Sequence, residues 1–435
     1  MMADLTSNFL GISSPNPFWL ASAPPTDKEY NVRRAFEAGW GGVVWKTLGS
    51  EGPPVVNVNG PRYGAIYGAD RRLLGLNNIE LITDRPLETN LEEIARVKAD
   101  YPDRAIIVSL MVPCEEQAWK DILPRVSETG ADGIELNFGC PHGMSERGMG
   151  AAVGQVPEYI EMVTRWCKQY YDKPVIVKLT PNIADIRKPA LAAKNGGADA
   201  VSLINTINSI TSVDLDLMCP EPTIDGKGSH GGYCGPAVKP IALNMVAEIA
   251  RDVEMQGLPI SGIGGVTNWR DAAEFMALGC GNVQVCTAVM TYGFKIVDEM
   301  CAGLSQWMDE KGYDNVSDFV GRAVPNVTDW KYLNLNYIAK AQIDQDQCIK
   351  CGRCYAACED TSHQAISMSE DRVFEVIDEE CVACNLCVEV CPVENCITMV
   401  EMAAGSVDPR TGKVVQEDYA NWTTHPNNSG AVAAE

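Results

Sequence analysis

The chain has 435 residues, a formal net charge of −23 and a hydrophobic content of 46%. Its length indicates about two or three domains. An excess of acidic residues this large disfavours tight general binding of nucleic acid, because phosphate backbones are anionic. No stretch reaches the about 18 to 20 consecutive apolar residues that span a membrane. We therefore expect neither a nucleic acid nor a membrane as a partner.

The cysteines and the first residues indicate a compartment. Eight of the 17 cysteines fall in two tight groups between Cys348 and Cys391, and the other nine are scattered. The chain does not begin with a basic segment followed by an apolar core, which is the pattern of a secretory signal peptide. Because these spacings do not resemble a disulfide framework, we expect a protein of the reducing cytoplasm.

Residues 18–288 alternate short apolar runs with amphipathic helical stretches, which predicts a parallel sheet buried on both faces. The helical stretches include 27–39, 115–126, 157–171, 269–279 and 294–308. The runs are 18–22, 42–47, 106–111, 133–138, 175–180, 200–206, 260–265 and 282–288. Eight repeats in about 270 residues fit the size of a (β/α)8 TIM barrel. A doubly wound open sheet is the alternative.

Polar residues or glycines end many of these runs. They are Lys46, Asn137, Lys178, Asn205, Thr206, Gly264, Gly265 and Thr287. This placement favours the barrel, because the active sites of such barrels lie at the C-terminal ends of the strands. Two long loops, 48–90 and 207–236, are rich in glycine, proline and asparagine, and long loops usually bind a ligand or cover a site. We expect the barrel to occupy residues 1–312.

The C-terminal part divides into a connector at 313–340, a cysteine-rich module at 341–400 and a polar tail at 401–435. Both cysteine groups follow C-x2-C-x2-C-x3-C, in which three thiolates hold one [4Fe–4S] cluster and the fourth reaches the other cluster. One predicted cluster is therefore bound by Cys348, Cys351, Cys354 and Cys391, and the other by Cys358, Cys381, Cys384 and Cys387. The sequence leaves open whether the tail is loosely ordered or wraps a partner.

Two closed zinc sites are the alternative for this module, although zinc sites usually use paired C-x2-C units. The module resembles bacterial-type two-cluster ferredoxins. Glu359 stands where proline usually follows the fourth cysteine, whereas Pro392 is present in the second group. We expect this departure to alter the potential or the solvent access of the cluster near Cys358 and to leave its ligation intact.

An iron–sulfur module attached to a barrel requires a redox group in the barrel. No G-x-G-x-x-G motif follows a predicted strand, so a dinucleotide-binding fold is not indicated and we expect a flavin. Gly264 and Gly265 follow the seventh run, and Cys286 and Thr287 end the eighth. The loops after strands 7 and 8 commonly form the phosphate site of a barrel, where glycine lets backbone amides approach the phosphate. A tight turn is the other explanation of the glycine pair.

Lys46 and Lys178 each end an apolar run, and a lysine there must point into a polar pocket. In one interpretation they are cations near the N1–C2=O edge of the flavin, where negative charge accumulates on reduction. In the other, each pairs with a carboxylate of the barrel.

Cys140 follows the fourth run, in the segment ELNFGCPHGMSERGMG (135–150). A thiol with a pKa of ~8.5 is mostly protonated at neutral pH and can act as an acid. The glycines after it suggest a loop that closes over a substrate. A lone cysteine is more often a packed thiol, but its place near Asn137 favours catalysis. His142 either tunes the thiol or caps the loop, and we interpret Glu80 as structural.

The chain also carries, in this order, the segments LASAPPT, RRAFEAGWG, WKT, NNIEL, ELNFGCPHGMSERGMG, KLTPN, NTIN, GPAVKPIAL, GGV and QVCTA. Together with the two cysteine groups they resemble the dihydropyrimidine dehydrogenases over nearly the whole chain. The dihydroorotate dehydrogenases are the broader relatives. The resemblance implies an FMN barrel that reversibly reduces the C5–C6 double bond of uracil or thymine. It also implies the catalytic subunit of a two-subunit form, because the FAD- and NAD(P)H-binding part is absent.

The resemblance assigns roles residue by residue. It implies that Cys140 is the catalytic acid. The implied FMN contacts are Ser22, Lys46, Thr47, Lys178, Gly235, Gly264, Gly265, Cys286 and Thr287. The implied pyrimidine contacts are Asn78, Asn137, Phe138, Gly139, Asn205 and Thr206. Gly139 departs from the serine that the family usually has before the cysteine, so a hydroxyl contact is expected to be missing and the backbone to be looser.

The resemblance further implies that a NAD(P)H-oxidising flavoprotein subunit passes electrons through the two clusters to FMN, within a hetero-oligomer. Three other readings stay open. The chain could act on a related pyrimidine as a dihydroorotate dehydrogenase, or be a tRNA dihydrouridine synthase, against which its charge argues. It could also be an electron relay without catalysis of its own, against which the set of Cys140, Lys46, Lys178 and the asparagines argues.

Overall fold

The computed structural model describes residues 3–50, 55–334 and 337–415. The chain divides into two compact units, unit 1 at Met1–Val327 and unit 2 at Thr328–Glu435. Most of the predicted tail, residues 416–435, lies outside the described residues. Within the described part, every helix is too short or too polar to cross a bilayer.

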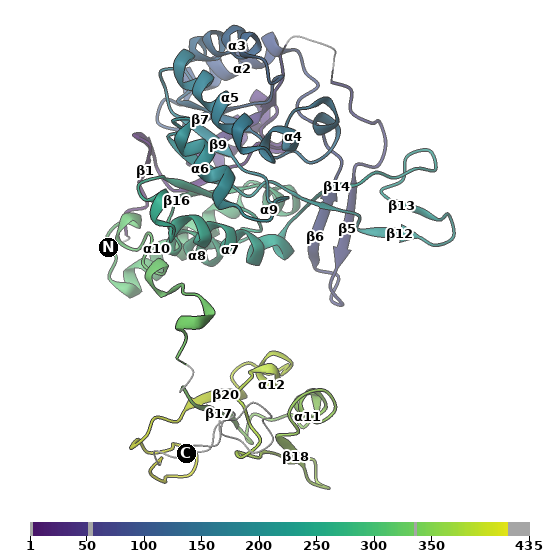
Figure 1. Cartoon of the computed structure of the whole chain (residues 1–435), viewed down its shortest axis with the longest axis vertical. Helices are drawn as coiled ribbons and strands as arrows, with labels where there is room; N and C mark the ends of the chain where they lie inside the picture. Colours follow the sequence, from purple (N-terminus) through teal and green to yellow (C-terminus); the bar gives the residue numbers. More distant parts are fainter. Residues whose placement is uncertain (1–2, 51–54, 335–336, 416–435) are drawn as a thin grey trace. The chain divides into compact units, whose positions relative to one another are not determined.

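Unit 1 is built on a closed barrel of eight parallel strands (Figure 1). These are β3 (Phe18–Leu20), β4 (Gly42–Leu48), β7 (Ala105–Leu110), β8 (Gly133–Asn137), β9 (Val175–Lys178), β10 (Ala200–Leu203), β15 (Ile260–Ile263) and β16 (Cys280–Val285). They pair in chain order, and β16 closes the barrel by pairing with β3. Every predicted run overlaps one of these strands. The predicted (β/α)8 barrel is confirmed, and the open sheet is wrong.

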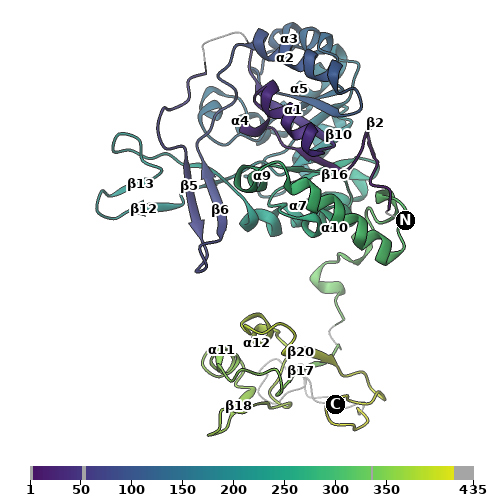
Figure 2. The same ribbon diagram turned by 180° about the vertical axis from the view of Figure 1, so that it is seen from behind.

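Helices surround the barrel (Figures 1 and 2). They are α1 (Glu29–Ala38), α2 (Leu87–Asp100), α3 (Glu116–Glu128), α4 (Ala151–Gly154), α5 (Pro157–Tyr170), α6 (Arg187–Asn195), α7 (Lys239–Ala250), α8 (Trp269–Ala277), α9 (Thr287–Tyr292) and α10 (Ile296–Lys311). Residues at the helix termini determine where these helices begin and end. Gly39 ends α1 with a φ of 110°, and the side chain of Asn268 accepts bonds from the first backbone amides of α8. Such N-caps contribute about 1 kcal/mol each.

The core lies between the strands and these helices. It includes Trp45, Ile94, Leu136 and Phe275, all inaccessible to solvent. Burial of one large apolar side chain contributes about 1.5–3 kcal/mol, so this layer holds the strand ends in place. The barrel interior is different, because buried polar side chains point into it. They include Glu135, Lys178, Ser202, Ser261 and Gln284.

The two long loops form further sheet rather than irregular chain. A four-stranded antiparallel sheet has the order β11–β14–β6–β5, and a separate hairpin pairs β12 with β13. The strands are β5 (Tyr63–Tyr67), β6 (Leu73–Asn78), β11 (Ile207–Ser209), β12 (Ser212–Asp214), β13 (Cys219–Glu221) and β14 (Gly231–Cys234). A further hairpin, β1 (Ser7–Phe9) with β2 (Ile12–Ser14), precedes the barrel. Asn78 and Cys234 end β6 and β14 and line the cavity described below.

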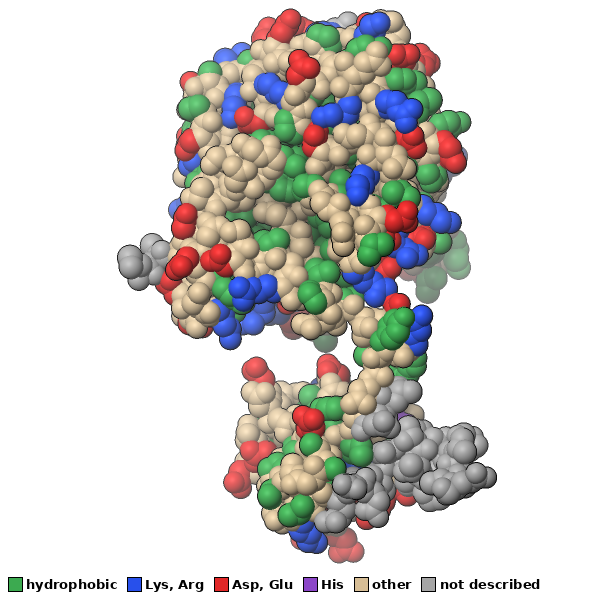
Figure 3. All heavy atoms as spheres, turned by 60° about the vertical axis from the view of Figure 1, so that its left-hand side comes forward, with side chains coloured by type: hydrophobic (Ala, Val, Ile, Leu, Met, Phe, Trp, Pro, Cys, Tyr) green, Lys and Arg blue, Asp and Glu red, His purple; other side chains and the backbone are tan. Residues whose placement is uncertain are grey.

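Short 3-10 helices connect these elements. They are η1 (Pro24–Thr26), η2 (Gly143–Arg147), η3 (Pro236–Val238), η4 (Val253–Met255), η5 (Val316–Asp318), η6 (Val324–Asn326) and η7 (Trp330–Tyr332). Acidic and basic side chains are interspersed over the face of unit 1 that Figure 3 presents. That face therefore has no continuous band of one charge.

Unit 2 contains two short antiparallel pairs and two short helices. The pairs are β17 (Ala339–Ile343) with β20 (Ile397–Glu401), and β18 (Ile366–Met368) with β19 (Phe374–Val376). The helices are α11 (Arg353–Glu359) and α12 (Leu386–Glu389). The first part of the predicted tail packs onto this unit, since the Arg410 guanidinium donates to both carboxylate oxygens of Asp378 at 2.8 and 2.9 Å.

Candidate active site

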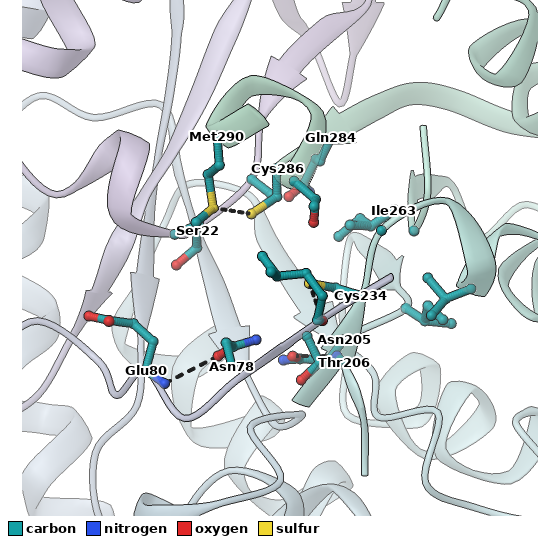
Figure 4. Close-up of a pocket in the computed structure, with 18 of the residues that line it drawn as sticks. Ser22, Asn78, Glu80, Asn205, Thr206, Cys234, Ile263, Gln284, Cys286 and Met290 are labelled. Carbon is teal, nitrogen blue, oxygen red and sulfur yellow. Dashed lines mark hydrogen bonds between the residues drawn. The ribbon is translucent and has the colours of Figure 1, made fainter. Parts of the chain in front are cut away.

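A cavity lies at the C-terminal ends of the barrel strands and is partly open to solvent; its space, with the open part included, is about 1140 Å³. It is lined by nearly all the site residues that the sequence predicted in the barrel: Ser22, Lys46, Thr47, Asn78, Asn137, Cys140, Lys178, Asn205, Thr206, Gly235, Gly264, Gly265, Cys286 and Thr287. Figure 4 shows several of them converging from different strands.

Phe138 and Gly139 do not line this cavity. Phe138 is buried and borders a smaller apolar cavity beside Trp119, because successive side chains along an extended chain point to opposite sides. A Cβ on Gly139 would lie 2.4 Å from both Cβ and Nδ2 of Asn205. The glycine therefore leaves room for Asn205, and the looser backbone and the missing hydroxyl contact stay predictions.

One chain of hydrogen bonds joins polar side chains of β4, of β8 and of the segment that follows β10. Asn205 Nδ2 donates to Asn137 Oδ1 at 2.9 Å, and Asn137 Nδ2 donates to Thr47 Oγ1 at 2.9 Å. Thr47 also contacts the hydroxyls of Ser22 and Ser109 at 3.0 and 2.9 Å. The backbone fixes the amide orientation at one end, since Thr206 N donates to Asn205 Oδ1 at 2.8 Å.

Asn78 is oriented in the same way (Figure 4). Its Oδ1 accepts from the Glu80 backbone amide at 3.3 Å, and its Nδ2 donates to Gly232 O at 2.9 Å. Glu80 also lines the cavity with its side chain. The sequence predicted that Glu80 is structural, and only its position two residues after Asn78, beyond the end of β6, could have indicated otherwise.

Both predicted lysines line the cavity and both are paired with carboxylates. Lys46 Nζ lies 3.0 Å from Glu80 Oε1 and 3.7 Å from an Asp27 oxygen. Lys178 Nζ lies 3.4 Å from Glu135 Oε1, and Glu135 is fully buried and bound by Ser202 at 2.7 Å. The pairing with carboxylates, one of the two alternatives for the lysines, is therefore confirmed, and a place at the flavin edge stays a prediction. The positive charges of the pocket are largely compensated.

Arg62 is a second cation that pairs with Glu80, since Arg62 Nη1 lies 3.1 Å from Glu80 Oε2. Tyr63, Cys234, Gln284 and Met290 also line the cavity without having been predicted from the sequence. Gln284 could have been recognised as a site residue in the sequence, because it is a polar residue inside an apolar run.

Burial raises the pKa of the Cys286 thiol to about 12, so this thiol stays neutral.

Cys140 follows the C-terminal end of β8 and is buried beneath the loop to which it belongs. Its Sγ donates to His142 O at 3.5 Å. Burial raises the pKa of the thiol to about 11, while that hydrogen bond and the charge of Lys178 act in the opposite direction. His142 Nε2 lies 2.9 Å from Glu80 O, and burial lowers the pKa of its imidazole. The thiol is therefore held in its protonated form next to the cavity.

Three glycines form a backbone cradle after β14 and β15. Gly235, Gly264 and Gly265 have φ values of 93°, 128° and 76°, which favour glycine. A Cβ on Gly264 would lie 2.8 Å from Ala242 Cβ, and one on Gly265 would lie 2.8 Å from Lys239 Cβ. Bare backbone of this kind, beside the Thr287 hydroxyl, fits the phosphate of a flavin nucleotide.

The two cysteine groups of unit 2 come together as the spacing predicts. One small cavity is lined by Cys348, Cys351, Cys354 and Cys391, together with Cys396. A second is lined by Cys358, Cys381, Cys384 and Cys387. Within the described residues, no three His, Cys, Asp or Glu side chains are close enough to hold a single metal ion. Thiols spread around a wider space suit the corners of a cubane better than the ligands of one zinc ion.

Comparisons with known proteins agree with both units. The profile of the dihydroorotate dehydrogenase family matches residues 4–308, and that of the 4Fe-4S dicluster domain matches residues 341–399. The chain is 43% identical over 400 residues to the NAD-dependent dihydropyrimidine dehydrogenase subunit PreA of Escherichia coli, with 92% of this chain and 96% of that protein covered.

Two other relatives each cover about three quarters of this chain. The chain is 42% identical to the chloroplastic dihydropyrimidine dehydrogenase (NADP(+)) of Arabidopsis thaliana, with 75% of this chain and 78% of that protein covered. It is 38% identical to the catalytic subunit of dihydroorotate dehydrogenase B (NAD(+)) of Pyrococcus abyssi, with 74% and 99% covered. The chain is an oxidoreductase of the dihydroorotate dehydrogenase family that carries a C-terminal 4Fe–4S domain.

Proposed function

We propose that the chain reversibly reduces the C5–C6 double bond of a neutral pyrimidine, uracil or thymine. The observation that carries the proposal is the set of three side-chain amides with orientations set by the protein. Asn78, Asn137 and Asn205 each use one N–H in the bonds described above. An amide nitrogen has two N–H groups, so Asn137 and Asn205 each keep one for a ligand, whereas the amide of Asn78 is also hydrogen-bonded to the Cys234 thiol.

This pattern suits the edge of uracil. An imide presents two carbonyl acceptors on either side of an N–H donor. The amides supply donors for the carbonyls, and the Glu80 carboxylate, which has more lone pairs than Lys46 and Arg62 occupy, supplies an acceptor for the N–H. Hydrogen bonds to a charged group are the stronger ones, so Glu80 would orient the ring.

The charge of the pocket distinguishes uracil from orotate. Lys46 and Lys178 already face the carboxylates of Glu80 and Glu135. The carboxylate of orotate would meet Glu80 without a matching unpaired lysine, and like charges in a poorly solvated site repel strongly. This balance supports a neutral substrate over the alternative of a dihydroorotate dehydrogenase.

Cys140 would supply the proton to C5. A general acid must be protonated at the working pH and must lie within reach of the substrate. The Cys140 thiol meets the first condition, because burial keeps its pKa at about 11, and its place in the lining of the cavity supports the second. In the reverse direction the same sulfur would accept the proton.

A flavin in the cavity would supply the hydride, and 4Fe–4S clusters in unit 2 would supply one-electron transfer to it. We infer FMN from the glycine cradle, with Lys46 and Lys178 at the redox-active end of the pocket. We infer two clusters from the two sets of four cysteines. Because a dinucleotide-binding motif was not found in the sequence, the reductant would be a NAD(P)H-oxidising flavoprotein partner in a hetero-oligomer.

An anaerobic mixing experiment tests the proposal. The chain is purified without oxygen, reduced chemically, and mixed with uracil, thymine or orotate while the flavin absorbance is followed. Rapid reoxidation with formation of dihydrouracil supports the proposal. Reoxidation by orotate alone would assign the chain to the dihydroorotate reaction, and no reoxidation by any of the three would leave an electron relay.

A further inference from the structure

Glu135 is a carboxylate buried inside the barrel. It lies on β8 two residues before Asn137, so both side chains point to the same side of the strand, and it is inaccessible to solvent. Its Oε2 accepts from Ser202 Oγ at 2.7 Å and from Gln284 Nε2 at 3.1 Å. Its Oε1 lies 3.4 Å from Lys178 Nζ. One oxygen is therefore held by two neutral donors, and the other faces a cation.

Glu135 lies behind the lining of the cavity. Within the described residues, the lining includes Lys178 and Gln284 and does not include Glu135. Gln284 Nε2 also donates to Ser261 Oγ at 3.0 Å, so both N–H groups of this amide have acceptors and its orientation is fixed. The carboxylate thus holds two lining residues without itself contacting a ligand in the cavity.

The charge of Lys178 acts within the cavity. Burial raises the pKa of the thiols of Cys140 and Cys286, which both line the cavity, and the charge of Lys178 acts in the opposite direction on each. Buried charges interact more strongly than exposed ones, and salt screens them much less. The carboxylate of Glu135, 3.4 Å from Lys178 Nζ, therefore weakens the positive field that this lysine exerts on a bound ligand.

We propose that Glu135 lowers the reduction potential of the flavin in this cavity, because its negative charge opposes the charge of Lys178. The inference rests on the flavin assignment in the proposed function. A flavin gains negative charge as it is reduced, so a nearby cation favours the reduced form and a buried anion favours the oxidised form. A lower potential makes the reduced flavin a stronger hydride donor to a pyrimidine. Glu135 is thus a positioning residue that acts through Lys178.

The test is an anaerobic redox titration of the flavin in the full chain, followed by its absorbance. Glu135→Gln removes the charge and keeps the side-chain length, whereas Glu135→Asp keeps the charge. Asp199→Asn is the matched control, because it removes a carboxylate that pairs with Lys168 at 2.7 Å and does not line the cavity. We expect the equilibrium constant for two-electron reduction to rise about tenfold in Glu135→Gln, or about 30 mV. Glu135→Asp and Asp199→Asn should keep the wild-type potential.

Bound FMN and circular dichroism are measured on every variant. An unchanged flavin potential in Glu135→Gln, or an equal rise in Glu135→Asp, would overturn the inference. Loss of FMN or of the fold in Glu135→Gln would also overturn it, because the carboxylate would then be required to assemble the site. A wild-type chain that binds no flavin would instead overturn the cofactor assignment, so the two failures can be told apart.

Discussion

The side chain of Asn205 fills the space that a side chain on Gly139 would need. A Cβ at position 139 would lie 2.4 Å from Asn205 Cβ, and Asn205 in turn donates to Asn137 at 2.9 Å. Atoms this close cannot coexist, so glycine at this position is a condition for the orientation of two proposed substrate contacts.

Gly139→Ala should therefore weaken pyrimidine turnover. The added methyl would displace Asn205 and break its bond to Asn137, at a cost of about 1–3 kcal/mol, which corresponds to a roughly 5- to 150-fold fall in kcat/KM. Steady-state kinetics with uracil measures the fall. A double variant with Asn205→Ala is the control: if the alanine acts through Asn205, the two effects are not additive, and full additivity would contradict the explanation.

Cys140→Ala should slow reduction of the pyrimidine by about 10²- to 10⁴-fold, because the proton donor is lost. Reduction of the flavin should be unaffected, since Cys140 takes no part in it. Stopped-flow mixing of the reduced variant with uracil separates the two steps. Cys301→Ala, which removes a half-buried thiol on α10, should behave like the wild type. Wild-type rates in Cys140→Ala would remove the thiol from the mechanism.

The pH dependence should follow the protonation of Cys140. Its pKa is raised from 9.0 to about 11, mainly by burial, so the neutral thiol persists about two pH units further than an ordinary cysteine. Pyrimidine reduction needs the thiol and should stay level between pH 7 and 10. Oxidation of the dihydropyrimidine needs the thiolate and should rise with pH over the same range. A reductive rate that declines near pH 9 would contradict this assignment.

Glu80→Gln should change the choice between substrates. Loss of the carboxylate removes a charged acceptor for the ring N–H, worth about 1.5–3 kcal/mol, and leaves Lys46 with only its more distant carboxylate neighbour, Asp27. Uracil binding should weaken, and orotate, which is anionic, should bind more tightly than to the wild type. Perturbation of the flavin spectrum measures both affinities. Glu80→Asp keeps the charge and should still exclude orotate.

Single cysteine variants should reveal the exchange of ligands between the two halves. Cys391 lines the cavity of Cys348, Cys351 and Cys354. Cys391→Ser should therefore perturb the cluster of the first group, although Cys391 belongs to the second group in sequence. Cluster content and paramagnetic resonance check this outcome. Cys396→Ser, at the edge of the same cavity, should retain iron for both clusters; loss of iron there would make Cys396 a ligand.

The barrel could be predicted because its signal is local. Each apolar run lies next to its own helix in sequence, and the residues at the ends of the runs, such as Lys46, Asn137 and Lys178, necessarily meet at one end of a parallel barrel. The convergence of most site residues follows from that topology. The direction of each side chain could not be predicted from that topology. Asn137 faces the cavity, whereas the side chain of the next residue, Phe138, points toward the helices.

The antiparallel sheet over the site could not be predicted in the same way. Its central pair joins Asn78 of β6 to Gly232 of β14, residues 154 positions apart. A local sequence pattern does not indicate which strands pair when they are this far apart in the chain. The strands are also short and rich in glycine and asparagine. The role of Glu80 was missed for the same reason, because the fold of this sheet brings its side chain to Lys46.

The exchanged cysteines of unit 2 have a consequence for how the protein is made. Each of the two cavities is lined by cysteines of both groups, so neither group could complete a proposed cluster site alone. Maturation should then be a joint event, in which metal delivery ties the two repeats together. Damage by oxygen at one site should loosen the other, so that the module is gained or lost as a whole.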